Sequence, residues 1–175
     1  MLWVKTFFGI LFQTILLGIF LYLPALTLNW SDAFLLLTIH FLMTILASAY
    51  LLIVKPESIE ARMNYDSKTQ PKEDRLATTL MFSAIIVGLS LAPIDIFHLN
   101  LSSSFEGSIK NIGLAIYIIG MLLFMASINA NEFAETTVNI QEERGQKVID
   151  TGIYSIVRHP MYTGFIFFIT GVNVW

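Results

Sequence analysis

Long apolar runs separated by short polar segments organise this chain. Four runs are long enough for membrane helices: Leu2 to Leu23, Ala33 to Val54, Leu76 to Phe97 and Ile109 to Ala130. A helix needs about 20 mostly apolar residues to cross roughly 30 Å of hydrocarbon. A fifth run, Met161 to Trp175, is apolar to its last residue. The pattern predicts an all-α, polytopic transmembrane helix bundle with about five membrane helices.

Residues at the borders of these runs refine the picture. The first run is expected to end before Pro24, and Ser31 with Asp32 is a good N-cap pair for the second. The first run is too long for a signal peptide and lacks a small-residue cleavage site, so we read it as a retained span. The 15 residues of the fifth run rise only about 22 Å as a helix. That run is either a half-span that turns back or part of a longer protein, and we expect the chain to be a fragment.

The distribution of basic residues predicts the orientation. If four helices cross in turn, one side holds nine of the ten Lys and Arg residues and the other holds only Lys110. The nine are Lys5, Lys55, Arg62, Lys68, Lys72, Arg75, Arg144, Lys147 and Arg158. Basic short loops stay in the cytoplasm. We therefore expect a cytoplasmic N-terminus and a multi-pass protein of the cell (inner) membrane.

Composition supports a membrane protein and removes several function classes. The chain is 55% hydrophobic and 13% charged, whereas soluble domains carry about 25% charged residues. The net charge of −3 argues against a nucleic-acid partner, because phosphate binding needs a basic face. The absence of cysteine excludes disulfides and thiolate chemistry. Oligomeric state is open, although Gly113 and Gly120 could mark close helix packing within or between chains.

Polar residues inside or beside the spans are candidates for function. His40 lies in the middle of the second span, and a hydrogen bond to another helix is favoured over a role at a substrate site. Asp95 and His98 are expected to reach interfacial water at the outer end of the third span. Glu132 and Glu135 could share a helix face, but without further ligands a solvated helix end is favoured, and no metal site is predicted.

The segment between the fourth and fifth runs differs from the rest. We divide the chain into residues 1–130, a four-helix transmembrane bundle, and residues 131–175, a cytosolic segment followed by the start of a fifth membrane helix. Pro160 can begin that helix, and it biases His159 away from helical angles. Irregular backbone at membrane depth survives only where protein or a polar cavity covers it. The segment can thus form a pocket wall, or Arg158 can merely anchor the helix while His159 caps it.

The motifs of this segment carry a family resemblance. Gln141, then "GQKVI", "TGIY" and "RHPMYTG", resembles the isoprenylcysteine carboxyl methyltransferases, a family of integral membrane methyltransferases. The similarity covers roughly the last third of the chain. Family members continue with a further helix and a stretch carrying an arginine and a glutamate, positions that do not occur here. A chain that ended at Trp175 would be expected to bind cofactor poorly.

The resemblance implies that S-adenosylmethionine binds at this segment. The cofactor-binding residues that it implies are Gln141, Gln146, Lys147, Val148, Ile149, Tyr154, His159, Pro160, Met161 and Tyr162. It implies methyl transfer to an acceptor delivered from the bilayer, such as an isoprenylcysteine-like carboxylate, another lipid or a small thiol. No catalytic residue is assigned. Two alternatives stay open: an NADPH-dependent membrane reductase of the sterol-reductase type, and a non-catalytic membrane protein.

Overall fold

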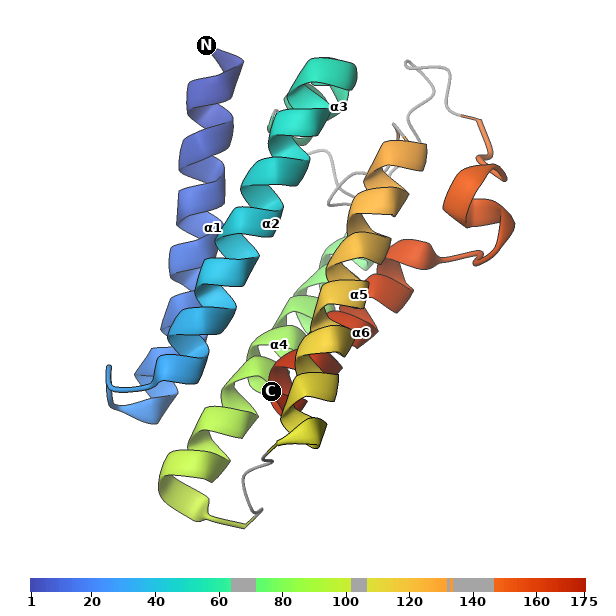
Figure 1. Cartoon of the computed structure of the whole chain (residues 1–175). Coiled ribbons are helices and arrows are strands. Elements are labelled where there is room, and N and C mark those ends of the chain that lie inside the picture. Colours follow the sequence, from blue (N-terminus) through green and yellow to red (C-terminus); the bar gives the residue numbers. More distant parts are fainter. Residues whose placement is uncertain (64–71, 102–106, 132, 134–146) are drawn as a thin grey trace.

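The computed structural model describes residues 1–63, 72–101, 107–131, 133 and 147–175. The described part is helical and contains no β-strand (Figure 1). In chain order the helices are α1 (Leu2–Ala25), α2 (Ser31–Val54), α3 (Pro56–Met63), α4 (Lys72–Ile94), a π-helical turn (Asp95–Leu99), α5 (Ser108–Ala130), a 3-10 turn (Gly152–Ser155) and α6 (Pro160–Val174). The all-α helix bundle expected from the sequence is confirmed.

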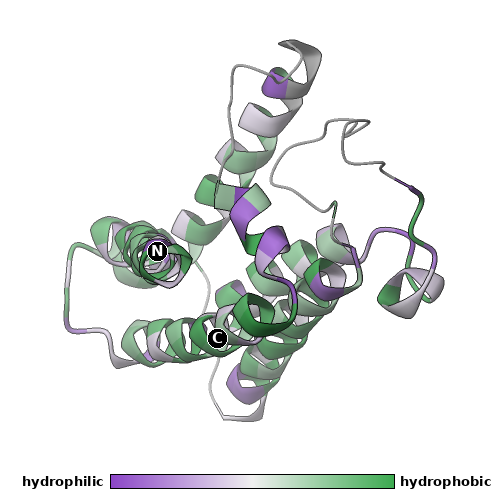
Figure 2. Cartoon of the chain, turned by 90° about the horizontal axis from the view of Figure 1, so that it is seen from above, coloured by the Kyte–Doolittle hydropathy of each residue, from purple (hydrophilic) through white to green (hydrophobic). Residues whose placement is uncertain are grey.

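Four helical segments are long and apolar enough to cross a membrane: Leu2–Ala25, Ser31–Val54, Thr78–Leu99 and Ser108–Ala130. The fifth apolar helix, Pro160–Val174, is shorter. Figure 2 shows hydrophobic residues around most of the circumference of the long helices, with hydrophilic residues mainly at their ends. A helix that is apolar on all sides must be surrounded by protein core or by lipid. This is a multi-pass membrane protein.

Two expected helix boundaries were wrong. Helix α1 continues through Pro24 and ends at Ala25, where Leu26 takes a left-handed conformation with φ of 53°. At the start of α2, Trp30 is the N-cap residue, and no side chain caps the helix. Ser31 and Asp32 are instead in the first helical turn. The Asp32 carboxylate is engaged by Lys110 at 2.6 Å, which explains why it does not cap its own helix.

The C-terminal end of α4 is held by two hydrogen bonds, one to the following loop and one to α1. The backbone N–H of Leu101 donates to Asp95 Oδ1 at 2.8 Å, and His98 Nε2 lies 2.7 Å from the carbonyl oxygen of Pro24. Since a carbonyl oxygen only accepts, His98 must donate there. These two side chains therefore tie the end of α4 to the following loop and to α1, in addition to being exposed or half-exposed as expected.

Helices α5 and α6 form an antiparallel pair at very short distance, in which glycines face the partner backbone (Figure 1). The glycines are seven residues apart on each helix: Gly113 and Gly120 on α5, Gly164 and Gly171 on α6. A Cβ atom added to Gly120 would lie 2.6 Å from the Phe168 amide nitrogen. Only glycine permits this approach, so the small-residue pattern marks packing within the chain.

One end of the bundle collects the elements that carry most of the basic residues. The start of α1, helix α3, the end of α5 and residues 147–158 all lie at this end, which we name the basic end (Figure 1). The Lys55 ammonium donates to the carbonyl oxygen of Asn129 at 2.5 Å and so joins α2 to α5 there. The short helix α3 follows α2 directly, and it buries Ser58 and Ile59 against the bundle.

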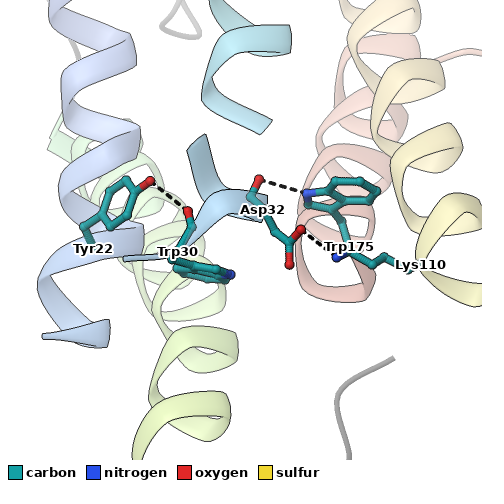
Figure 3. A network of polar contacts seen from close by, with 5 residues as sticks. All are labelled: Tyr22, Trp30, Asp32, Lys110 and Trp175. Atoms are coloured by element: carbon teal, nitrogen blue, oxygen red, sulfur yellow. Dashed lines mark hydrogen bonds and ion pairs between the residues drawn. The ribbon is translucent and has the colours of Figure 1, made fainter. Parts of the chain in front are cut away.

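At the opposite end, a polar network connects α1, α2, α5 and α6 (Figure 3). The Tyr22 hydroxyl donates to the Trp30 carbonyl oxygen, and the Trp175 indole N–H donates to that of Asp32, both at 3.1 Å. The Lys110 ammonium pairs with Asp32 and lies 4.8 Å from the centroid of the Trp175 ring. Helix α6 thus runs from the basic end to the level where α2 and α5 begin.

Candidate functional site

The segment that carries the sequence motifs lies at the basic end, beside the end of α5 (Figure 1). Residues Lys147 to Asp150 have no regular secondary structure, and Val148 is 92% exposed. Gly152, with φ of +60°, turns the chain into the short 3-10 helix, where the Tyr154 N–H donates to the Thr151 carbonyl at 3.2 Å. Residues 147–150 are therefore an irregular and mostly exposed stretch.

The 3-10 turn is attached to the end of α5. The Asn131 side-chain amide donates to the Tyr154 hydroxyl at 3.4 Å, and Tyr154 is half-buried. A Cβ atom on Gly152 would lie 3.5 Å from the Cβ of Ala130. These contacts hold the TGIY motif against α5, so the motif is part of the bundle's end and not a detached loop.

The RHP motif forms the irregular turn that starts α6. Pro160 is the first residue of the helix and is fully buried, while His159 precedes it with φ −129° and ψ 62°. The His159 and Tyr162 rings stack with centroids 5.8 Å apart and an interplanar angle of 25°. The Thr163 hydroxyl donates to the His159 carbonyl at 3.1 Å. The irregular backbone and the helix start at Pro160 are confirmed.

The structure brings together some of the expected site residues. His159 and Tyr162 form one exposed pair, and Tyr154 lies near Asn131. Of the others, Lys147 is exposed, Ile149 and Met161 are half-buried, and Pro160 is packed inside. Gln141, Gln146, Glu132 and Glu135 lie outside the described residues. Within the described ranges, no group of three or more His, Cys, Asp or Glu residues could hold a metal ion.

The exposed ring pair has a defined chemical capacity. Tyr162 is 52% exposed, and its ring stacks on the ring of His159. The imidazole and the phenol therefore offer π faces and hydrogen-bonding atoms to a ligand at one position. Aromatic faces attract cations, and they stack on planar heterocycles. The pair can therefore hold a small ligand that combines a positive charge with an aromatic ring.

A partly open cavity of about 440 Å³ lies between the helices, a feature that the sequence analysis missed. Five helices contribute to its wall. Its lining residues are Gln13, His40, Thr44, Ala47, Ser48, Leu51, Ile59, Arg62, Gly120, Met121, Phe124, Met125, Ile128, Gly164, Phe165 and Phe168. The volume falls in the range of ligand pockets, about 300–1,000 Å³. We name it the bundle cavity.

One wall of the bundle cavity is polar. His40, Thr44 and Ser48 are four residues apart on α2 and share a face of that helix. His40 Nδ1 lies 2.8 Å from the Tyr117 hydroxyl of α5, so the expected interhelical hydrogen bond is confirmed. The four-residue spacing was the signal in the sequence that could have indicated a polar wall.

Helix α6 connects the motif segment with the bundle cavity. Gly164 and Phe165 line the cavity, and Gly164 follows His159 by five residues. Five helical residues rise about 7.5 Å. The exposed His159–Tyr162 pair and the cavity-lining residues Gly164 and Phe165 therefore all lie at the start of α6.

Comparisons with known proteins concern this same part of the chain. The profile of the phospholipid methyltransferase family (PEMT) matches residues 109–175. Over 67 residues the chain is 36% identical to "Protein-S-isoprenylcysteine O-methyltransferase B" of Arabidopsis thaliana. This match covers 38% of the chain and 34% of the relative, so the chain aligns with about a third of that protein's length. No solved structure matches the chain.

The family match begins one residue after the start of α5 and continues through the motif segment to the end of α6. It therefore coincides with the glycine-packed helix pair and the turn between them. Residues 109–175 thus match the phospholipid methyltransferase family and are similar to an isoprenylcysteine O-methyltransferase, which confirms the resemblance inferred from the motifs.

Proposed function

We propose that the protein is an integral membrane methyltransferase that moves a methyl group from S-adenosylmethionine to an acceptor delivered from the bilayer. The observation that carries the proposal is the coincidence of the family match with the α5–α6 unit, which holds the His159–Tyr162 pair beside the bundle cavity. A methyl donor site and an acceptor site must adjoin for direct transfer. The α5–α6 unit carries the His159–Tyr162 pair and also lines the bundle cavity.

The proposed donor site is the motif segment. Its residues are Gln141, Gln146, Lys147, Val148, Ile149, Tyr154, His159, Pro160, Met161 and Tyr162. The fit rests on the stacked, exposed rings of His159 and Tyr162, whose π faces suit a sulfonium cation and an adenine ring. Pro160 and the glycine-packed helix behind it keep these rings in place.

When bound, S-adenosylmethionine supplies a methyl group on a positively charged sulfur. The chain's own part is to hold both reactants in line, because orientation alone can provide a large share of such a rate enhancement. A carboxylate acceptor is ionised near neutral pH, so its reaction needs no general base. The apolar wall of the bundle cavity, with Met121, Phe124 and Phe165, suits the hydrocarbon part of a lipidic acceptor and excludes water.

The proposed side of the membrane follows from charge. Nine of the ten Lys and Arg residues belong to the segments expected at the basic end, and basic short loops stay in the cytoplasm. The donor site then faces the cytosol, where a water-soluble cofactor would be available. We propose the cell (inner) membrane as the location.

A binding titration tests the proposal. Purified full-length protein in nanodiscs is titrated with S-adenosylmethionine, and His159→Ala and Tyr162→Ala are each expected to weaken binding about tenfold, since a cation–π contact at an exposed site and ring stacking together contribute roughly 1–2 kcal/mol. Ile166→Ala is the matched control, because Ile166 lies on the same helix and is 64% exposed. Absence of saturable binding, or saturable NADPH binding in its place, contradicts the proposal.

A further inference from the structure

We infer that the bundle cavity accommodates one hydrocarbon chain and that Phe168, with His40 and Tyr117, forms a floor that limits the chain's length. The inference rests on the proposed function in taking the ligand to be the lipidic acceptor. It goes further in naming a single-chain amphiphile, whose head group lies at the basic end, and in naming the residues that select chain length.

The lining residues define where the cavity stops. On α2 they extend from Leu51, near the basic end, to His40; on α6 they extend to Phe168. Among the described residues, none farther from the basic end on these two helices lines the cavity. The eleven helical rises between His40 and Leu51 correspond to about 16 Å of helix. That depth is close to one leaflet's share, about 15 Å, of the hydrocarbon core.

An aromatic cluster closes the cavity at that depth. The Phe168 ring lies 5.3 Å from the Tyr117 ring and 6.1 Å from the His40 ring, measured between centroids. Tyr117 is completely buried and hydrogen-bonded to His40. Behind it, a Cβ atom added to Gly171 would clash with the Tyr117 backbone, so α6 packs directly against this part of α5. A chain that reaches this cluster meets closely packed aromatic rings.

Size and lining favour one chain with its head at the basic end. A volume of about 440 Å³ over this depth leaves a narrow space. Met121, Met125, Phe124 and Phe165 supply apolar and adaptable walls. Arg62 and Ile59 of α3 line the end nearest the basic end, where a polar head group would reach water. A two-chain lipid would have to leave one chain outside.

The test is a chain-length series measured without methyl donor. Saturated fatty acids of increasing length displace a radiolabelled fatty acid from the full-length protein in nanodiscs. Affinity is referred to the free aqueous concentration of each fatty acid, for which each buried methylene adds roughly fourfold, equivalent to about 0.8 kcal/mol, until the chain reaches the floor. We expect the increase to stop at one length in the wild type. Phe168→Ala should move this limit to longer chains, and Thr44→Phe should move it to shorter ones.

The control variant is Ile166→Ala, which removes a lipid-facing side chain from the same helix and should leave the limit unchanged. A fatty acid with a photoreactive terminal methyl group should crosslink to Met121 or Phe168. The inference is overturned if affinity follows length identically in all variants, if crosslinks fall outside the cavity, or if a two-chain phosphatidic acid competes as well as the best fatty acid.

The two proposals can fail separately. If the chain-length limit changes in Phe168→Ala but S-adenosylmethionine does not bind, the chain-binding cavity is supported and the methyltransferase assignment is contradicted. Conversely, methyl transfer to a lipid with no dependence on Phe168 keeps the assignment and removes the floor.

Discussion

His40 of α2 and Tyr117 of α5 are 77 positions apart in the sequence, yet they are joined by a 2.8 Å hydrogen bond in the interior of the bundle. Both side chains are almost fully buried. Such a bond satisfies two polar groups that would otherwise face hydrocarbon, and it sets the rotation of α2 relative to α5. It also fixes the imidazole at the end of the bundle cavity.

We expect Tyr117→Phe to lower the thermal unfolding midpoint in detergent, because His40 Nδ1 loses its partner. A double-mutant cycle with His40→Leu should give a coupling of about 0.6 to 1.7 kcal/mol, the average and upper value found for interhelical bonds in membranes. Tyr50→Phe is the matched control, since Tyr50 lies on α2 and is 51% exposed. Equal decreases of the unfolding midpoint in Tyr50→Phe and Tyr117→Phe would show that the His40–Tyr117 hydrogen bond contributes nothing specific to stability.

The α5–α6 pair depends on glycine at its contacts. Adding a methyl group in Gly120→Ala places a carbon 2.6 Å from the Phe168 amide, so the helices must separate. Overpacking of this kind costs about 1–3 kcal/mol. Gly9→Ala on α1 is the control, because nothing lies within 4 Å of its added Cβ. The measurement is the unfolding midpoint of each variant, and a Gly120→Ala protein as stable as Gly9→Ala would contradict the close packing.

Parts of this structure follow directly from local sequence. The long apolar runs specify the spans, and Pro160 specifies the start of α6, since both depend on residues close together in the chain. The N-cap at Ser31 and Asp32 was predicted wrongly because Lys110, from a distant helix, engages that carboxylate. Similarly, an interhelical bond was expected for His40, but its partner Tyr117 is defined only once α5 packs against α2.

The candidate site also has one part that local sequence specifies and one part that depends on contacts between distant residues. The motif segment was located by its residues, whereas the bundle cavity is formed by single faces of five helices and has no contiguous motif. Its only local trace is the spacing of His40, Thr44 and Ser48. The stacking of His159 on Tyr162 follows from their three-residue spacing across the first turn of α6, where side chains at i and i+3 are neighbours.

Thr44 gives a direct probe of what fills the bundle cavity. Its hydroxyl is buried and has no hydrogen-bond partner among the described residues. An unpartnered buried hydroxyl costs about 1–3 kcal/mol whether or not a chain is bound, because water does not reach it in either state. We therefore expect Thr44→Val to raise the thermal unfolding midpoint and, since only an apolar chain packs at this depth, to leave fatty-acid affinity within about twofold in the same displacement assay.

Thr38→Val is the comparison for this variant, because Thr38 is exposed and its hydroxyl donates to the Phe34 carbonyl at 2.8 Å. That change should leave fatty-acid affinity within about twofold, as is usual for surface substitutions. If Thr44→Val weakens binding, the hydroxyl contacts a polar group of the ligand, and the purely apolar chain assigned to that depth is wrong.

The orientation of the bundle can be tested cleanly because the chain contains no cysteine. Single cysteines are introduced as Ser155→Cys, in the motif segment at the basic end, and Ser108→Cys, at the start of α5 on the other end; both serines are exposed. In intact cells a membrane-impermeant maleimide should label only the Ser108→Cys protein, since basic short loops stay in the cytoplasm and the basic end is therefore expected there. Both should react after the membrane is made permeable. Labelling of the Ser155→Cys protein in intact cells would place the His159–Tyr162 pair outside, away from cytosolic S-adenosylmethionine, and would remove the donor site proposed for it.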